Sequence, residues 1–160
     1  MKEAQSGDLL LAGRALICPG NRHMKVRRMD HGDIAVLVDQ PRVNGHRPSV
    51  DVLFQSLAQE FGSRSVSIIM TGMGDDGVIG TGAVQAVGGN TIAQSPDTCI
   101  VDSMPRHAIE RRFVSRVVSL SNLASVLQSI CTPERPSAAP EAVTSPADAA
   151  TELDSRRRSS

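Results

Sequence analysis

The residues of this sequence that could do chemistry lie in the segment Thr71-Gly-Met-Gly-Asp-Asp-Gly77. Its glycines allow backbone conformations that other residues avoid, and they leave amide N–H groups unobstructed. Asp75 and Asp76 add two adjacent carboxylates. The segment therefore combines backbone hydrogen-bond donors with acidic side chains within one short turn.

Three kinds of site fit this combination. The amides could hold a phosphate, but adjacent carboxylates would repel it and no lysine stands where a phosphate-binding loop needs one. The two aspartates could bind Mg²⁺, which would require further oxygen ligands that the sequence does not identify. One aspartate could instead be the acid of a catalytic triad, where it orients a histidine. A tight turn with a capped helix start explains the segment equally well, and the residues alone do not decide.

The surrounding pattern predicts that this turn joins a strand to a helix. Residues 66–70 form a nearly continuous apolar run, which is typical of a central parallel strand covered on both faces. A helix over residues 76–87 follows and ends at two glycines. In open α/β sheets functional groups gather at the carboxyl ends of strands, which is where this turn lies.

The clearest helix comes earlier, over residues 50–61, where apolar residues recur at helical spacing up to Gly62. Ser49 is placed to cap it, and Asp51 to complement its dipole. Short β candidates at residues 14–18, 24–28 and 34–38 indicate a small antiparallel excursion. Strands at 91–93 and 113–119, with helices at 105–111 and after Ser121, complete a strand–helix alternation that predicts an α/β fold with a mainly parallel sheet.

Composition narrows the class of protein. The 160 residues suffice for one domain with a core, and 17 basic residues balance 17 acidic ones. A neutral chain without Trp or Tyr lacks both the charge and the stacking surfaces of a nucleic-acid-binding protein. The start has no signal-peptide core and no run approaches membrane-spanning length, so we expect a cytoplasmic protein without membrane insertion.

The cysteines and the C-terminal part add two further expectations. Cys18, Cys99 and Cys131 are odd in number and scattered, which indicates reduced thiols rather than a disulfide framework. Cys18 and His23 could each ligate zinc, but no second pair completes a tetrahedral set, and we expect neither a metal nor a cofactor. The Pro/Ala/Ser-rich composition of residues 132–160 predicts a disordered tail behind a domain at residues 1–131.

Several separated stretches resemble the CheB-type chemotaxis protein-glutamate methylesterase family. They are Cys18-Pro-Gly-Asn-Arg-His-Met24, Val43-Asn-Gly-His-Arg-Pro-Ser-Val-Asp-Val-Leu-Phe54, Ile69-Met-Thr-Gly-Met-Gly-Asp-Asp-Gly77, Ala93-Gln94, and Met104-Pro-Arg106 with Ala108-Ile109. They occur in the family's order and cover about residues 2–128, the C-terminal portion of its catalytic domain.

The resemblance implies a doubly wound α/β esterase. The family removes methyl groups from glutamate methyl esters of bacterial chemoreceptors, and many members deamidate receptor glutamines. Asp76 matches its triad acid, and the backbone amide of Met73 matches a candidate oxyanion donor, whereas Asp75 stands where the family also accepts Asn. The implied partners are the cytoplasmic regions of methyl-accepting chemotaxis receptors.

The sequence departs from the family at its start. The family's nucleophilic Ser and relay His precede the matched region, and neither they nor a substitute Gly-x-Ser-x-Gly elbow is found. None of His23, His31, His46 and His107 matches the catalytic histidine. The family's first parallel strands precede the matched region too, so we expect a sheet that is incomplete on its N-terminal side, with the strand at 66–70 lacking a neighbour.

Three interpretations follow from this departure. The chain is a truncated methylesterase, a catalytically inactive module that still docks on receptors or on a full-length esterase, or a degenerate fragment without a stable fold. For the 160-residue chain alone we expect no esterase activity, because the members of a triad act as a unit.

Overall fold

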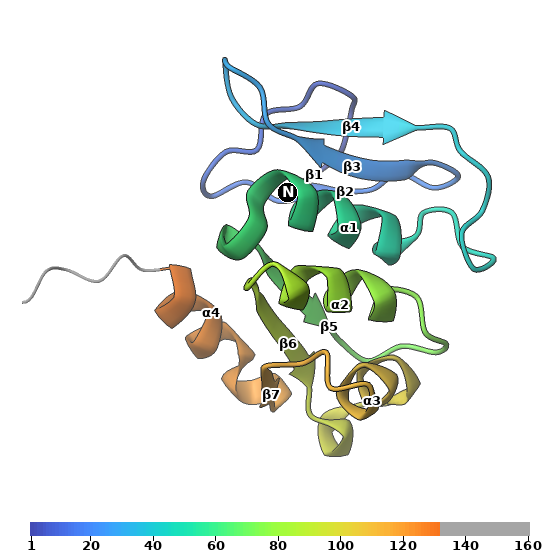
Figure 1. The fold of residues 1–160 in the computed structure, drawn as a ribbon, viewed down its shortest axis with the longest axis vertical. Helices are drawn as coiled ribbons and strands as arrows, with labels where there is room; N and C mark the ends of the chain where they lie inside the picture. Colours follow the sequence, from blue (N-terminus) through green and yellow to red (C-terminus); the bar gives the residue numbers. More distant parts are fainter. Residues whose placement is uncertain (132–160) are drawn as a thin grey trace, which may run out of the picture. The chain divides into compact units, whose positions relative to one another are not determined.

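The computed structural model describes residues 1–131, and the predicted tail at 132–160 lies outside the described residues. The strands are β1 (Lys2–Glu3), β2 (Leu16–Ile17), β3 (His23–Arg27), β4 (Ile34–Val38), β5 (Val66–Ile69), β6 (Asn90–Gln94) and β7 (Arg116–Val118). The helices are α1 (Val50–Phe61), α2 (Val78–Ala86), α3 (Ser103–Glu110) and α4 (Leu123–Cys131), with short 3₁₀ turns at Gly62–Arg64, Pro96–Thr98 and Leu120–Asn122 (Figure 1). Within residues 1–131, no helix is long and apolar enough to cross a membrane.

The parallel sheet has the strand order β5-β6-β7. Val66 aligns with Asn90, and Ile92 aligns with Arg116. β6 is therefore the central strand, and its Ile92 and Ala93 are fully buried. Among the described residues β5 pairs with β6 alone, so the apolar run at residues 66–70 belongs to an edge strand of this sheet and not to its central strand.

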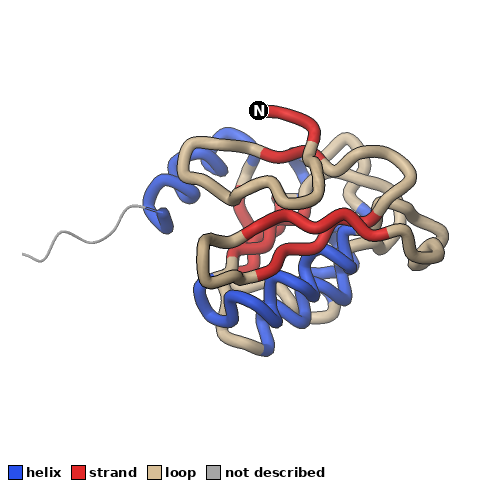
Figure 2. Tube along the Cα trace, turned by 90° about the horizontal axis from the view of Figure 1, so that it is seen from above, coloured by secondary structure: helices blue, strands red, loops and turns tan. Residues whose placement is uncertain are grey.

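The antiparallel excursion is the hairpin of β3 and β4, in which His23 aligns with Val38 and Arg27 with Ile34. The hairpin lies beside α1 (Figure 2), and the hydroxyl of Ser56 in α1 accepts a hydrogen bond from the Val26 amide at 3.0 Å. The expected strand at residues 14–18 does not join this hairpin. Its core, β2, pairs in parallel with β1, a strand that the sequence pattern did not predict.

Helices α1 and α2 pack closely on each other and on the sheet. Phe54 and Ala58 of α1, Val78 and Val84 of α2 and Ile69 of β5 share one buried apolar cluster. Gly80 of α2 makes the close approach possible, since a Cβ there would lie 2.6 Å from the Cβ of Phe54. As predicted, α1 ends at Gly62, which adopts a positive φ of 56°.

The start of α1 differs from the prediction. Ser49 occupies the N-cap position, but its side chain makes no capping hydrogen bond to the helix. The carboxylate of Asp76 takes that place, because it accepts hydrogen bonds from the amides of Val50 and Asp51. Helix α1 is thus capped by a residue far along the chain, which local sequence rules do not foresee.

Candidate active site

The turn at Thr71–Gly77 leads from the carboxyl end of β5 into α2 and is fixed by Val101 and by Ser103 at the start of α3. The Gly72 amide donates to the Val101 carbonyl at 2.8 Å, and the Gly74 amide donates to the Ser103 hydroxyl at 3.0 Å. Gly74 and Gly77 have φ values of 96° and 93°, a region that L side chains rarely adopt. These contacts and positive φ values define the backbone path of the turn.

Asp76 is the buried carboxylate of this turn, with a relative exposure of 6%. Its Oδ1 accepts hydrogen bonds from the Ser49 hydroxyl at 2.7 Å and from the Asp51 amide at 3.2 Å, and its Oδ2 accepts one from the Val50 amide at 2.8 Å. These donors come from the first residues of α1 and from the residue before it, so they hold the carboxylate against the start of that helix. Since a carboxylate has about four acceptor positions, one position on Oδ2 remains for a further donor.

Asp51 is a second buried carboxylate, one residue further along α1. Its Oδ1 accepts a hydrogen bond from the Gly80 amide in α2 at 2.7 Å, and its Oδ2 accepts one from the Asn44 side chain at 3.3 Å. Burial raises the pKa of Asp51 above its ordinary value, the Gly80 amide opposes this, and the charge of Asp76 adds to it. Asp51 was predicted to complement the dipole of its own helix, but its carboxylate binds the start of α2 instead.

A serine, a histidine and an aspartate meet at the start of α1, but they are not connected as a catalytic triad. The Ser49 hydroxyl donates directly to Asp76, whereas the Ser49 amide donates to Nδ1 of His23 at 3.2 Å. Because Nδ1 accepts, the ring proton lies on Nε2, which donates to the Pro41 carbonyl at 3.0 Å. His23 is fully buried with both ring nitrogens engaged, so this ring is not placed to relay a proton or to join Cys18 in binding a metal.

Met73 projects from the turn with 82% of its surface exposed. Within residues 1–131 its amide N–H donates no hydrogen bond, which leaves it available to an anionic oxygen. The side chain of Asp75 is exposed as well, and its carbonyl accepts from the Val78 amide. Both carboxylate oxygens of Asp76 accept hydrogen bonds from the start of α1, whereas the side chain of Asp75 is exposed. The two carboxylates therefore do not form the paired-aspartate site that Mg²⁺ would need. The arrangement does not suit a phosphate-binding loop either.

His107 contacts the turn, although the sequence analysis assigned this histidine no role. Its Nδ1 lies 3.1 Å from the Gly74 carbonyl, so α3 holds the turn from outside. The ring is bound to this backbone oxygen and not to the Asp76 carboxylate. His31 and His46 are exposed. Nothing in the sequence signals the His107 contact, because α3 and the turn are brought together by the sheet.

The fold and the turn define an α/β domain with a buried carboxylate in the turn that follows the carboxyl end of a parallel strand. A family model described as CheB methylesterase matches residues 1–127, and the chain therefore belongs to the CheB methylesterase family. The resemblance to that family and the α/β fold predicted from the sequence are thereby confirmed.

Named relatives give the same result. The chain is 63% identical over 127 residues to protein-glutamate methylesterase/protein-glutamine glutaminase 2 of Koribacter versatilis, which covers 79% of this chain and 35% of the relative. A protein-glutamate methylesterase/protein-glutamine glutaminase of Treponema pallidum is 47% identical over 127 residues. This match covers 79% of this chain and 32% of the relative. The chain thus spans about a third of the length of these curated relatives.

A solved structure extends the comparison to three dimensions. The crystal structure of the Thermotoga maritima CheB methylesterase catalytic domain matches with a TM-score of 0.78 and 30% sequence identity. The match covers 80% of this chain and 68% of that domain. The described fold is therefore the family's fold over most of the domain.

Proposed function

We propose that this chain carries the acid-bearing part of a protein-glutamate methylesterase active site, with Asp76 as the triad acid. The observation that carries the proposal is the unused acceptor position of the Asp76 carboxylate, buried at the carboxyl end of β5 and held by three donors. A triad aspartate must be fixed and ionised, so that it can orient an imidazole and stabilise its charged form. Family membership supports the same assignment.

In this proposal the Met73 amide is the oxyanion donor. A serine hydroxyl attacks the ester carbonyl while a histidine removes its proton, and the carbonyl oxygen becomes negatively charged. The exposed Met73 N–H would stabilise that charge, and one such donor is worth about 3 kcal/mol in other hydrolases. The substrates would be the glutamate methyl esters and glutamines that the relatives' names state, carried by the cytoplasmic regions of chemotaxis receptors.

The described residues supply the acid but not its two partners. The serine and the histidine near Asp76 are Ser49 and His23, which are buried and hold the start of α1. We therefore expect the purified 160-residue chain to release no methanol from methylated receptor. Release that is abolished by Ser49→Ala or His23→Gln, in variants that remain folded, would show that this cluster is catalytic and would overturn the assignment.

A chimera tests the proposal itself. Residues 1–127 of this chain replace the matched segment in the Koribacter versatilis relative, and methanol release from methylated receptor is compared with that of the relative. We expect the chimera to be active, because the relative contributes the remainder of its catalytic domain. A folded chimera without activity would contradict the proposal that this turn can serve an esterase.

A further inference from the structure

The hydroxyl of Ser103, the first residue of α3, bridges the two sides of Met73. It donates a hydrogen bond to the Gly72 carbonyl at 3.0 Å and accepts one from the Gly74 amide at 3.0 Å. The Gly72 carbonyl and the Met73 N–H belong to one peptide plane, and the Gly74 N–H belongs to the next. One hydroxyl therefore holds both peptide planes that meet at the Cα of Met73, using its proton for one and a lone pair for the other.

This contact fixes the direction of the Met73 N–H. The peptide bond between Gly72 and Met73 is trans, so its carbonyl and its N–H point in opposite directions. The Gly72 carbonyl points toward α3, where it accepts a hydrogen bond from the Met104 amide at 3.2 Å as well as the one from Ser103. The Met73 N–H therefore points away from α3. Donation to the carbonyl also polarises the peptide group, which makes its N–H a stronger donor.

The Ser103 hydroxyl does not serve its own helix. Asp102 occupies the N-cap position of α3, and its side chain makes no capping hydrogen bond. Both hydrogen bonds of the Ser103 hydroxyl lead to the turn after β5, about thirty positions earlier in the chain. A side chain that leaves the start of its own helix without a cap and binds a distant turn indicates a role in that turn.

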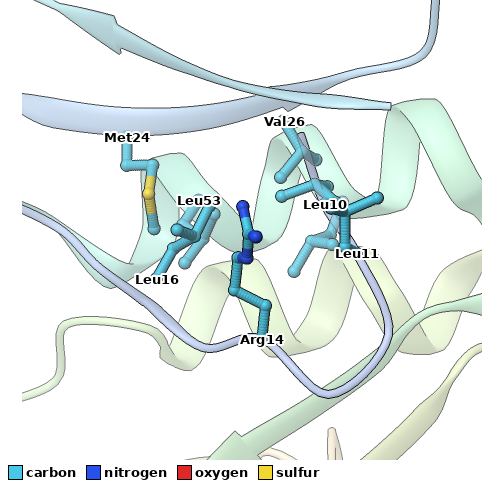
Figure 3. A pocket seen from close by; sticks show the side chains of 8 residues that line it. Leu10, Leu11, Arg14, Leu16, Met24, Val26 and Leu53 are labelled. Atoms are coloured by element: carbon cyan, nitrogen blue, oxygen red, sulfur yellow. The ribbon is translucent and has the colours of Figure 1, made fainter. Parts of the chain in front are cut away.

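The apolar cavity in the N-terminal part of the chain gives the turn no such contact. Its volume is about 370 Å³, and its one charged lining residue is Arg14, whose guanidinium extends between apolar side chains such as Leu16 and Leu53 (Figure 3). In the described part of the chain, none of its lining residues forms a hydrogen bond with the turn. The first half of the turn is held instead by Gln94 of β6, whose side chain accepts from the Thr71 amide at 3.0 Å, and by the start of α3.

We propose that Ser103 is a positioning residue of the active site, whose hydroxyl directs the Met73 N–H at the negative charge that develops on the carbonyl oxygen of the substrate. This inference rests on the proposed function, in which Met73 supplies the oxyanion donor. Such a donor is effective when it already points at the oxygen as the charge forms. The side chain of Met73 cannot turn its own backbone N–H, so the direction is set by the groups that bind the neighbouring carbonyl and amide.

NMR relaxation of the 160-residue chain tests this positioning without any reference to esterase activity. In the unmodified chain the Met73 amide should have an order parameter of about 0.85, the value of a rigid backbone. Ser103→Ala removes both hydrogen bonds and should lower the order parameter below about 0.6. Ser103→Thr retains a hydroxyl and should restore it. An unchanged order parameter in folded Ser103→Ala would overturn the inference.

Methanol release by a chimera, in which residues 1–127 replace the matched segment of the Koribacter versatilis relative, tests the consequence for catalysis. Ser103→Ala should lower kcat about ten-fold, a part of the roughly 10²- to 10³-fold that loss of a whole oxyanion donor costs. KM should stay nearly unchanged, because the charge on the oxygen develops in the transition state and not in the bound substrate. A rise in KM at constant kcat would overturn the inference. A folded chimera that is inactive with Ser103 in place would contradict the proposed function, and the order parameter would still decide the role of Ser103.

Ser115→Ala is the matched control. The Ser115 hydroxyl also bridges a backbone amide and a carbonyl, because it accepts from the Thr91 N–H at 3.1 Å and donates to the Thr91 carbonyl at 2.7 Å. The variant therefore loses hydrogen bonds of the same kind, beside β6 and away from the turn. It should leave the Met73 order parameter and kcat unchanged. Equal losses of kcat in Ser103→Ala and Ser115→Ala would show that reduced stability lowers the rate, and would overturn the inference.

Discussion

The carboxylates of Asp51 and Asp76 each lie at the start of the other's helix. Asp76 precedes α2 and accepts from the Val50 amide of α1 at 2.8 Å, while Asp51 belongs to α1 and accepts from the Gly80 amide of α2 at 2.7 Å. This exchange satisfies N–H groups that helix starts leave without partners, and it joins the two helices. The proposed triad acid is thus also a structural residue, and its two roles must be separated experimentally.

Removal of the Asp76 carboxylate should destabilise the fold. In Asp76→Ala the Ser49 hydroxyl and the amides of Val50 and Asp51 lose their acceptor, and we expect a loss of about 2–4 kcal/mol in the free energy of unfolding. Asp76→Asn keeps one acceptor oxygen and should lose less. Denaturant unfolding followed by circular dichroism measures both losses.

Asp75→Ala is the matched control for this prediction. Asp75 is adjacent but exposed, and its side chain accepts no hydrogen bond within the described residues. We expect its free energy of unfolding to stay within about 0.5 kcal/mol of the unmodified chain. Equal stability of Asp76→Ala and Asp75→Ala would show that the contacts of Asp76 do not stabilise α1.

Asp51 should make stability depend on pH in an unusual direction. Burial raises its folded-state pKa above the ordinary 3.8, so between these two pKa values the folded chain binds more protons than the unfolded chain. The contribution of this group to stability therefore increases as pH falls through that window and decreases as pH rises.

Asp51→Asn removes the titration and keeps an acceptor for the Gly80 amide. The stability of this variant relative to the unmodified chain should be highest above the raised folded-state pKa of Asp51 and should decline as pH falls from there toward the ordinary 3.8. Urea midpoints across that range measure the difference. A difference that does not change with pH would mean that the pKa of Asp51 is not raised.

Gly80→Ala should lower stability although alanine is the better helix former. By propensity alone the substitution would gain about 1 kcal/mol. The new Cβ would lie 2.6 Å from the Phe54 Cβ and 3.1 Å from the Asp51 Cα, so α1 and α2 would have to separate. We expect a net loss of about 1–3 kcal/mol in thermal or denaturant unfolding.

The control for Gly80 is Gly20→Ala, where a Cβ meets nothing within 4 Å and φ is not positive. This variant should be nearly as stable as the unmodified chain. If Gly80→Ala were the more stable of the two, the contact between the helices would be looser than described.

The sequence predicted the helices and strands near the site better than the way in which they pair and contact one another. Periodicity placed α1 and its end at Gly62, and the apolar run at residues 66–70 marked β5. The apolar run did not show that β5 is an edge strand within residues 1–131. Such a run indicates that side chains are buried, but it does not indicate which strands pair through their backbones.

The same limit applies to the site. The adjacent pair Asp75 and Asp76 was visible in the sequence, and the resemblance singled out Asp76 as the acid. That Asp76 rather than Ser49 caps α1, and that Ser49 connects it to His23, depends on contacts between residues more than twenty positions apart. Local capping rules describe near neighbours alone, so they favoured Ser49.

Methanol release by the chimera with the Koribacter versatilis relative, measured with and without Asp76→Asn, tests the role of Asp76 most directly. The stability of both forms is determined first, so that a loss of fold is not mistaken for a loss of catalysis. We predict that kcat falls about 10³- to 10⁴-fold in folded Asp76→Asn, because an amide cannot hold the relay histidine in its active tautomer. A folded Asp76→Asn chimera that releases methanol at an undiminished rate would contradict the account.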